Sequence, residues 1–234
     1  MTVISRADIH IHTTCSNAFM TPEAVVDYVV RSTNLQMVAI TDHDTIAGAI
    51  RARSYMKERY GTTCRLAIVV GTEVSSSDGH VIGLFLKDNI SPGLPARRTI
   101  DLIHAQGGLA IAPHPYARWL RKWGMQGVGD AIQHLPFDAV ETRNATPTEI
   151  CANRIARRRN SQFQRLPEIG GSDAHYLCMI GKAYTLFEGN TPEDLYRSLR
   201  RGAVVAGGNI CNLTAVVIAI LKMLLQRRMG GIIP

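Results

Sequence analysis

Short polar clusters that contain histidine recur along this chain, and each follows an apolar, strand-like run. Six of the eight histidines lie in these clusters. The main clusters are separated by roughly the length of one strand–helix unit, so a barrel-like α/β scaffold would bring them to one rim. Imidazole and carboxylate groups that converge in this way bind metal ions. The clusters are Asp8-Ile-His10-Ile-His12, Thr41-Asp42-His43-Asp44, Gly71-Thr-Glu73, His80, Ala112-Pro-His114-Pro115 and Gly171-Ser-Asp173-Ala-His175.

The spacing within two clusters places pairs of ligands on one face of a strand. Successive side chains of a strand alternate between its two sides, so His10 and His12 point the same way and can converge on one ion. Asp173 and His175 repeat this two-residue spacing near the other end of the chain. The two histidines of the first cluster, with the carboxylates of Glu73 and Asp173, form a donor set suited to Mn²⁺, Fe²⁺ or Zn²⁺.

The remaining polar residues predict more than one metal. Four histidines are left to bind further ions: His43, His80, His114 and His175. The Glu73 carboxylate could bridge two of the ions. Asp8 is expected to orient a histidine ring through a hydrogen bond. Two metals about 3.5–4 Å apart can clamp a phosphoryl group and ionise a bound water. Metal-dependent hydrolysis is therefore the leading hypothesis.

These clusters need strands to position them, and the apolar runs supply them. Between the runs lie amphipathic helical patterns, with Thr21 and either Asp44 or Thr45 as expected N-caps. Alternation of strands and helices predicts a parallel sheet and, with about seven units, a closed or nearly closed barrel in one domain over residues 1–234. The predicted strands are 36–41, 66–70, 81–86, 109–112, 137–141, 166–170, 183–187 and 203–206, and the predicted helices are 24–32, 46–59, 95–105, 148–159 and 192–201.

Composition limits the classes of protein and of partner. The formal charge of +7 comes mostly from arginine, which suits an anionic substrate, although solvated helix faces would explain it equally well. Five cysteines without close pairs argue against a disulfide framework or a zinc ribbon and favour a reducing, cytoplasmic location. The amino terminus runs directly into the first cluster, which leaves no space for a signal peptide.

Two segments stand apart from the strand–helix pattern. Residues 210–228 contain the apolar run LTAVVIAILKMLL, which is too short to span a bilayer comfortably, so we expect a helix packed on the barrel or at the interface of a homodimer. Residues 118–129 carry both tryptophans and several cations. They follow the cluster of His114, so they are either a substrate-contacting loop or a surface excursion.

The ordered motifs DIHIHTTCSNAF, AITDHDT, GTE, HVIG, APHP and GGSDAH resemble those of the PHP (polymerase and histidinol phosphatase) family, and the match is closest to its small stand-alone phosphoesterases. The resemblance covers roughly residues 7–206. It implies a distorted (β/α)7 barrel, similar to a TIM barrel, with two or three divalent metal ions. By the same resemblance, His10, His12, Glu73 and Asp173 hold the first metal, Glu73, His80 and His114 the second, and His43 and His175 the third.

One position departs from the family pattern. Many members carry an acidic residue after the first motif, where this chain reads Ser16-Asn17-Ala18. An amide brings no negative charge, so the third ion is expected to bind loosely or only with substrate. Asp42, beside His43, is expected to be either an alternative ligand or a residue that orients one.

The predicted function is hydrolysis of a small phosphomonoester or nucleotide by attack of a metal-bound hydroxide, with Mn, Zn or Fe as the metal and Mg as an alternative. His43 or His175 would protonate the leaving group where it is free of metal. Arg143, just past a strand end, is the first candidate for binding the substrate phosphate, ahead of Arg118 and Arg121. The alternatives are a nuclease acting on nucleic-acid ends, an amidohydrolase-like enzyme, and a metal-binding regulatory protein with reduced activity. The nuclease is not favoured, because the sequence contains no recognisable nucleic-acid-binding module.

Overall fold

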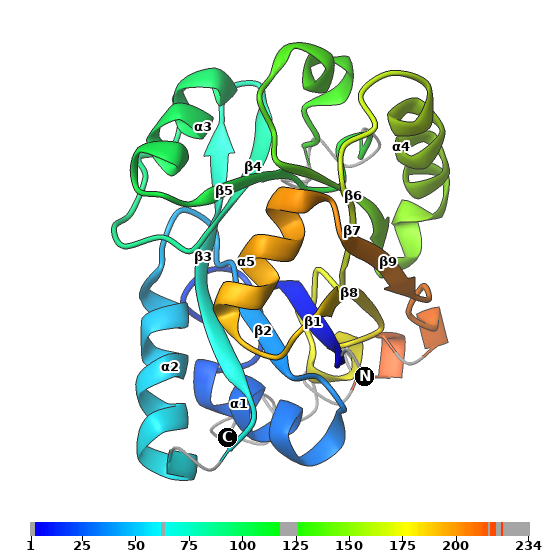
Figure 1. Cartoon of the computed structure of the whole chain (residues 1–234). Helices are drawn as coiled ribbons and strands as arrows, with labels where there is room; N and C mark the ends of the chain where they lie inside the picture. The colour runs from blue at the N-terminus through cyan, green and yellow to red at the C-terminus, as the bar shows by residue number, and fades with distance from the viewer. Residues whose placement is uncertain (1–2, 62–63, 118–125, 215, 219–220, 222–234) are drawn as a thin grey trace.

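The computed structural model describes residues 3–61, 64–117, 126–214, 216–218 and 221. Within these residues nine strands form one sheet in the order β7-β6-β5-β4-β3-β2-β1-β8-β9. The sheet curves into a nearly closed barrel, which confirms the predicted α/β barrel class (Figure 1). The strands are β1 (Ile4–Ile11), β2 (Met37–Ile40), β3 (Ala67–Ser76), β4 (Gly79–Leu84), β5 (Leu109–Ala112), β6 (Ala139–Asn144), β7 (Glu168–Gly171), β8 (Ala183–Glu188) and β9 (Val204–Gly208).

The sheet is mixed, and the expectation of a parallel sheet was wrong. Strand β1 pairs in parallel with β2, as do β2 with β3, β5 with β6 and β6 with β7. Strand β4 is antiparallel to β3 and β5, and β8 is antiparallel to β1 and β9. Only residues 77 and 78 separate β3 from β4, so these strands form a hairpin with no crossover helix. The sequence predicts this strand over residues 81–86, but not that it returns antiparallel to β3 without a helix.

Strand β7 closes the barrel by packing across β8 and β9. The backbone N–H of Gly170 donates to Thr185 Oγ1 over 3.1 Å. A Cβ at position 170 would lie 2.5 Å from the Tyr184 carbonyl oxygen, so only glycine permits this approach.

The helices lie close to where the sequence predicts them. They are α1 (Pro22–Ser32), α2 (Ala47–Tyr60), α3 (Ala96–Ala105), α4 (Ile150–Gln162) and α5 (Pro192–Arg201). Thr21 Oγ1 accepts from the Ala24 N–H at the start of α1, as predicted. The N-cap position of α2 is Ile46, and the Oγ1 of Thr45, one of the two predicted caps, accepts from the Ala47 N–H over 3.1 Å. Asp44 instead has a φ of +58° and accepts from the N–H and hydroxyl of Ser75.

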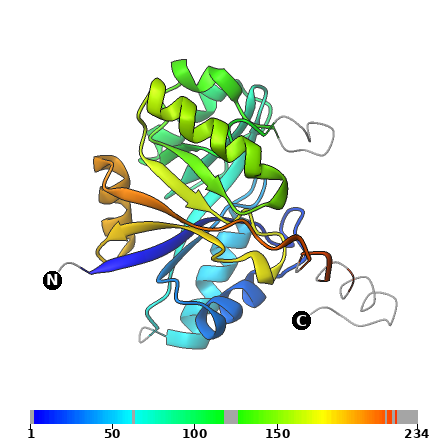
Figure 2. The same ribbon diagram turned by 90° about the vertical axis from the view of Figure 1, so that its right-hand side faces the viewer.

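Alternate residues of the strands pack on opposite sides of the sheet. In β2, Met37 and Ala39 belong to one buried cluster with Leu195 and Leu199 of α5, whereas Val38 and Ile40 belong to a second with α1, α2 and α3. Helix α5 therefore covers one end of the barrel, beside the amino-terminal end of β1 (Figure 2). The opposite end carries the predicted ligands.

The described part of the apolar carboxyl-terminal segment is partly packed on the barrel. Residues 213–214 and 216–218 are helical, and Val216 packs against the larger buried cluster. Leu213, Val217, Ile218 and Leu221 are exposed. Within the residues searched, no helix has the length and apolar character needed to cross a membrane.

Candidate metal centre

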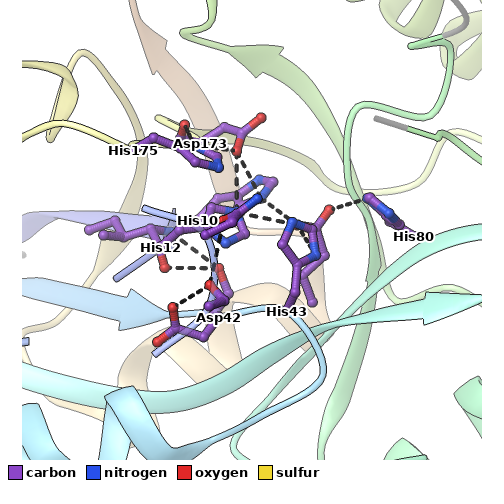
Figure 3. A network of polar contacts seen from close by, with 12 residues as sticks. His10, His12, Asp42, His43, His80, Asp173 and His175 are labelled. Atoms are coloured by element: carbon purple, nitrogen blue, oxygen red, sulfur yellow. Dashed lines mark hydrogen bonds and ion pairs between the residues drawn. The ribbon is translucent and has the colours of Figure 1, made fainter. Parts of the chain in front are cut away.

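Eight of the nine predicted ligands come together at the end of the barrel opposite α5. They are supplied by β1, by the loop after β2, by the β3–β4 hairpin and by the loops after β5 and β7. Figure 3 shows His10, His12 and Asp173 pointing toward one another, with His43 and His80 on one side. The eight are His10, His12, His43, Glu73, His80, His114, Asp173 and His175, and they form four overlapping groups of three.

The first group consists of His10, His12 and Asp173. The two Nε2 atoms of the histidines lie 3.2 Å apart. Asp173 Oδ1 lies 3.5 Å from His10 Nε2 and 3.3 Å from His12 Nε2. The pair of histidines two residues apart on β1 therefore converges on one point, as the alternation of side chains predicts.

Glu73 lies at the centre of the whole cluster. Its Oε1 is 2.9 Å from both His80 Nδ1 and His114 Nε2. Its Oε2 is 3.4 Å from His10 Nε2, 3.2 Å from His12 Nε2 and 3.5 Å from His43 Nδ1. Two of the four groups, His10–Glu73–His114 and His43–Glu73–His80, share this carboxylate. Its two oxygens thus face different sets of imidazoles, as a bridging ligand requires.

The last group joins His12, His43 and His175. The ring of His12 stacks against those of His43 and His175, with centroids 4.7 and 4.5 Å away. His175 Nδ1 lies 3.0 Å from the Asp173 carbonyl oxygen, so that nitrogen carries the hydrogen and leaves Nε2 as the donor to a metal. This group consists of histidines alone.

These residues fit metal ions by their spacing and by their unsatisfied atoms. The ligand atoms of each group lie within 4.8 Å of one another, close to the ~4.4 Å that separates opposite ligands of one ion at about 2.2 Å. The Nδ1 atoms of His12, His43, His80 and His114 are buried without a hydrogen bond. His80 Nδ1 approaches Glu73 Oε1 to 2.9 Å without the alignment of a hydrogen bond. Buried polar atoms are normally paired. The open Nδ1 atoms of His43 and His80 face Glu73, where a cation would satisfy them, whereas His12 and His114 face Glu73 through Nε2.

The electrostatics of the cluster favour cations. Burial would raise the pKa of Glu73, but His80, His43 and His10 outweigh it and hold that pKa well below its usual range. Asp173 behaves in the same way beside His10 and His12. Burial would lower the pKa of His114, yet Glu73 raises it to about 9. The carboxylates therefore stay ionised and hold positive charge near them.

Two histidines at the edge of the cluster respond to burial instead. Burial lowers the pKa of His43 to about 4, and it also lowers the pKa of His175. Both rings are therefore neutral at pH 7, which is the form that binds metal.

Glu141, at the middle of β6, belongs to the centre although the sequence did not single it out. Its Oε1 lies 3.0 Å from His10 Nδ1, and its Oε2 accepts from the His114 backbone N–H. Asn144 Nδ2 donates to Glu141 and to Asp173 Oδ2. Glu141 thus takes the orienting role expected of Asp8, whose carboxylate instead accepts from backbone N–H groups such as that of Gly181.

Asp42 lies apart from the four groups. Its Oδ1 accepts from the Thr13 N–H and the Ser16 hydroxyl, each over 2.6 Å, and its Oδ2 accepts from the Thr13 hydroxyl over 2.7 Å. The carboxylate is completely buried. This placement favours the second of the two expected roles, because Asp42 fixes the loop that follows His12.

Arg143 does not reach the cluster. Its Nη1 donates to the Gly208 carbonyl over 2.8 Å, and the side chain lines a separate hollow with Arg157 and Arg165. Arg118, Arg121 and both tryptophans lie outside the described residues. A cation that binds substrate phosphate is therefore not found among the described side chains around the ligands.

A cavity of about 500 Å³ opens over the ligands. Its floor contains His43, Glu73, His80, His114, Asp173 and His175, and Asn17 lies at its edge. The rest of the lining is largely apolar: Phe19, Pro147, Tyr176, Met179 and Val216. A cavity of this size accommodates a small organic ligand.

Comparison with known proteins assigns the family. A family model described as PHP-associated matches residues 151–204. A two-domain protein of Bacteroides vulgatus that contains a predicted PHP-like metal-dependent phosphoesterase superposes with a TM-score of 0.71 at 17% identity, over 89% of this chain and 66% of that one. The chain belongs to the PHP family.

Sequence relatives match the chain over different lengths. An uncharacterized protein of Methanocaldococcus jannaschii is 36% identical over 173 residues, which cover 70% of the PHP chain and 94% of that protein. The 5'-3' exoribonuclease Rnm of Salmonella typhimurium is 37% identical over 95 residues, which cover 39% of the PHP chain and 30% of Rnm. PHP membership supports the class of metal-dependent phosphoesterases and nucleases and leaves the substrate open.

Proposed function

We propose that this protein is a metal-dependent phosphoesterase that hydrolyses a small phosphomonoester. The observation that carries the proposal is Glu73, whose two oxygens face five imidazoles on the floor of a substrate-sized cavity. We assign His10, His12, Glu73 and Asp173 as the ligands of one ion, and His80 and His114 as further ligands that share Glu73. His43 and His175 complete a third group with His12. The donor set suits Mn²⁺, Zn²⁺ or Fe²⁺.

The chain's own residues prepare this site for hydrolysis. Divalent ions bound in these groups would acidify a coordinated water and neutralise phosphoryl oxygens. Glu141 holds His10 Nδ1, so that Nε2 of the same ring faces Glu73 and Asp173. The apolar side of the cavity limits the water around a bound ester, which strengthens the electrostatic interactions there.

The test is phosphate release by metal-stripped and metal-reloaded protein. We expect Mn²⁺-loaded protein to hydrolyse p-nitrophenyl phosphate and His12→Asn to lose at least ~100-fold of that activity, as expected for removal of a metal ligand. His104→Asn is the matched control, because His104 pairs with Asp138 on the outside of the barrel. Bound metal is counted on the same samples. Full activity in a His12→Asn protein would refute the assignment.

A nuclease is the second candidate, and the similarity to the exoribonuclease Rnm favours it. The net charge of +7 is compatible with a nucleic-acid substrate. Parallel assays on a phosphomonoester and on a 5'-phosphorylated oligonucleotide distinguish the two reactions. An amide substrate tests the amidohydrolase alternative, and metal bound without turnover of any of these would identify a regulatory metal-binding protein.

A further inference from the structure

An aromatic wall stands beside the polar floor of the cavity. Phe19 and Tyr176 stack in parallel, with ring centroids 5.1 Å apart and 16° between their planes. Both line the cavity together with Met179 and Val216. Phe19 comes from the loop after β1 and Tyr176 from the loop after β7, so two distant segments of the chain combine to build this wall.

The aromatic wall is fixed to the metal ligands. The backbone N–H of Phe19 donates to the His175 carbonyl over 3.1 Å, and Tyr176 is the next residue along the chain from His175. Thr14 donates its backbone N–H to the Met20 carbonyl, which closes the loop between His12 and Phe19. Both rings therefore keep a set position relative to His12 and His175. A wall held in this way can select what is attached to a phosphoryl group on the floor.

The rest of the cavity offers few alternatives for recognising the leaving group. Among the described residues that line it, none is lysine or arginine. Among these described residues a second phosphate would find no lysine or arginine, whereas an apolar ring would find the aromatic pair and Met179. Flat rings stack well on aromatic side chains whatever their hydrogen-bonding edges.

We infer that Phe19 and Tyr176 form a specificity wall that binds a planar ring on the leaving group of the phosphoester, such as the base of a nucleoside monophosphate. The predicted effect on hydrolysis rests on the proposed function, whereas the predicted binding of a planar ring does not. A free nucleotide and the terminal nucleotide of a strand present the same ring. The lack of a described cation for further phosphates favours the free nucleotide.

The kinetic test compares AMP with ribose 5-phosphate, which has the same ester without the base. We expect the Mn²⁺-loaded protein to prefer AMP, and Phe19→Leu or Tyr176→Leu to raise KM for AMP roughly 10-fold, a typical effect of losing one stacking partner. Values for ribose 5-phosphate should stay unchanged. Phe163→Leu, which removes an exposed phenylalanine elsewhere, is the control and should behave as wild type. Equal losses on both substrates, or no preference for AMP, would overturn the inference.

A binding test separates this inference from the proposed function. Calorimetry with adenosine on metal-free protein should show binding that Phe19→Leu and Tyr176→Leu weaken, while ribose should not bind. If no phosphoester is hydrolysed but adenosine binds in this pattern, the proposed function is refuted and the role of the aromatic wall is supported. If phosphoesters are hydrolysed but adenosine does not bind, only the role of the aromatic wall is refuted. A 5'-phosphorylated oligonucleotide, assayed beside AMP, identifies whether the ring belongs to a free nucleotide or to a strand end.

Discussion

Gly48, at the second position of α2, offers a sharp test of how the metal centre is built. A Cβ at this position would lie 1.9 Å from Asp42 Oδ2 and 2.7 Å from Thr13 Oγ1. Ordinary contact begins near 3.4 Å, so in Gly48→Ala the carboxylate must retreat by 3.4 − 1.9 = 1.5 Å. Because Asp42 accepts three hydrogen bonds from Thr13 and Ser16, that movement breaks at least one of them.

The size of the effect follows from these contacts. Overpacking a tight site costs about 1–3 kcal/mol, and losing a hydrogen bond to a charged group costs about 1.5–3 kcal/mol. Alanine regains up to ~1 kcal/mol of helix propensity over glycine. We therefore expect Gly48→Ala to lower the free energy of unfolding by roughly 2–5 kcal/mol. Thr13 follows His12 directly, so metal affinity should fall as well.

Urea denaturation of the metal-free protein measures the stability, and titration with Mn²⁺ measures the affinity. Ser54→Ala is the control, because it makes an alanine on the exposed side of the same helix. A Gly48→Ala protein as stable as wild type, with unchanged Mn²⁺ affinity, would refute the role given to Asp42 as the anchor of the loop after His12.

Four further predictions concern the ligands and their surroundings. Glu73→Gln should weaken Mn²⁺ binding by roughly 100-fold or more. Glu168→Gln is the control and should retain Mn²⁺ binding, because the Glu168 carboxylate accepts hydrogen bonds from Thr142 and Asn160 away from the centre. Equal metal contents in the two variants would contradict the bridging role of Glu73. Asn17→Asp adds a carboxylate at the edge of the cavity and should raise the number of tightly bound metals, as counted by elemental analysis; an unchanged count would separate Asn17 from the third group. Metal binding at pH 7 should release protons, because the pKa of His114 is about 9 and only its neutral ring binds metal. The apparent metal affinity should therefore rise from pH 7 to 9. Calorimetry in buffers of different ionisation enthalpy measures the proton release, and no release would contradict the assignment of His114 as a ligand. Arg143→Ala should leave KM for p-nitrophenyl phosphate unchanged, since its guanidinium is held at the Gly208 carbonyl, and a large rise in KM would place it at the substrate after all.

The sequence predicts most of the elements because their signals are local. The helix over residues 192–201 has the bounds predicted for it, since Thr191 and Asp194 form a capping box at its start and Gly202 ends it in the left-handed conformation. The strand over residues 109–112 is equally well defined by its apolar run. The β3–β4 hairpin was not recognised as one, because its two runs are apolar throughout and carry no alternation that tells an antiparallel pair from two parallel strands.

The expected ligands were easier to name than the residues that orient them. Two histidines two residues apart on a strand are predicted to converge from the sequence alone, but the residue that orients a histidine ring depends on the tertiary structure. Asp8 is nearest to His10 in sequence, yet Glu141, 131 positions away, holds the His10 ring. The signal for Glu141 is that it follows an apolar run directly within its strand, much as Glu73 follows the apolar start of β3. A buried carboxylate costs too much free energy to remain without partners, so each such acid predicts a polar centre.

The difference between Glu73 and Glu141 shows where the sequence stops being informative. Both are buried acids on strands of one sheet, but only Glu73 lies on the long β3 strand, which pairs with β4 in the hairpin. That turn brings His80 back beside β3, so one Glu73 oxygen faces His80 and His114 while the other faces His10, His12 and His43. Glu141 has His10 and the His114 backbone on its two oxygens and no second ring to bridge. The position of Glu73 between two sets of imidazoles is therefore a consequence of the helix-free hairpin between β3 and β4.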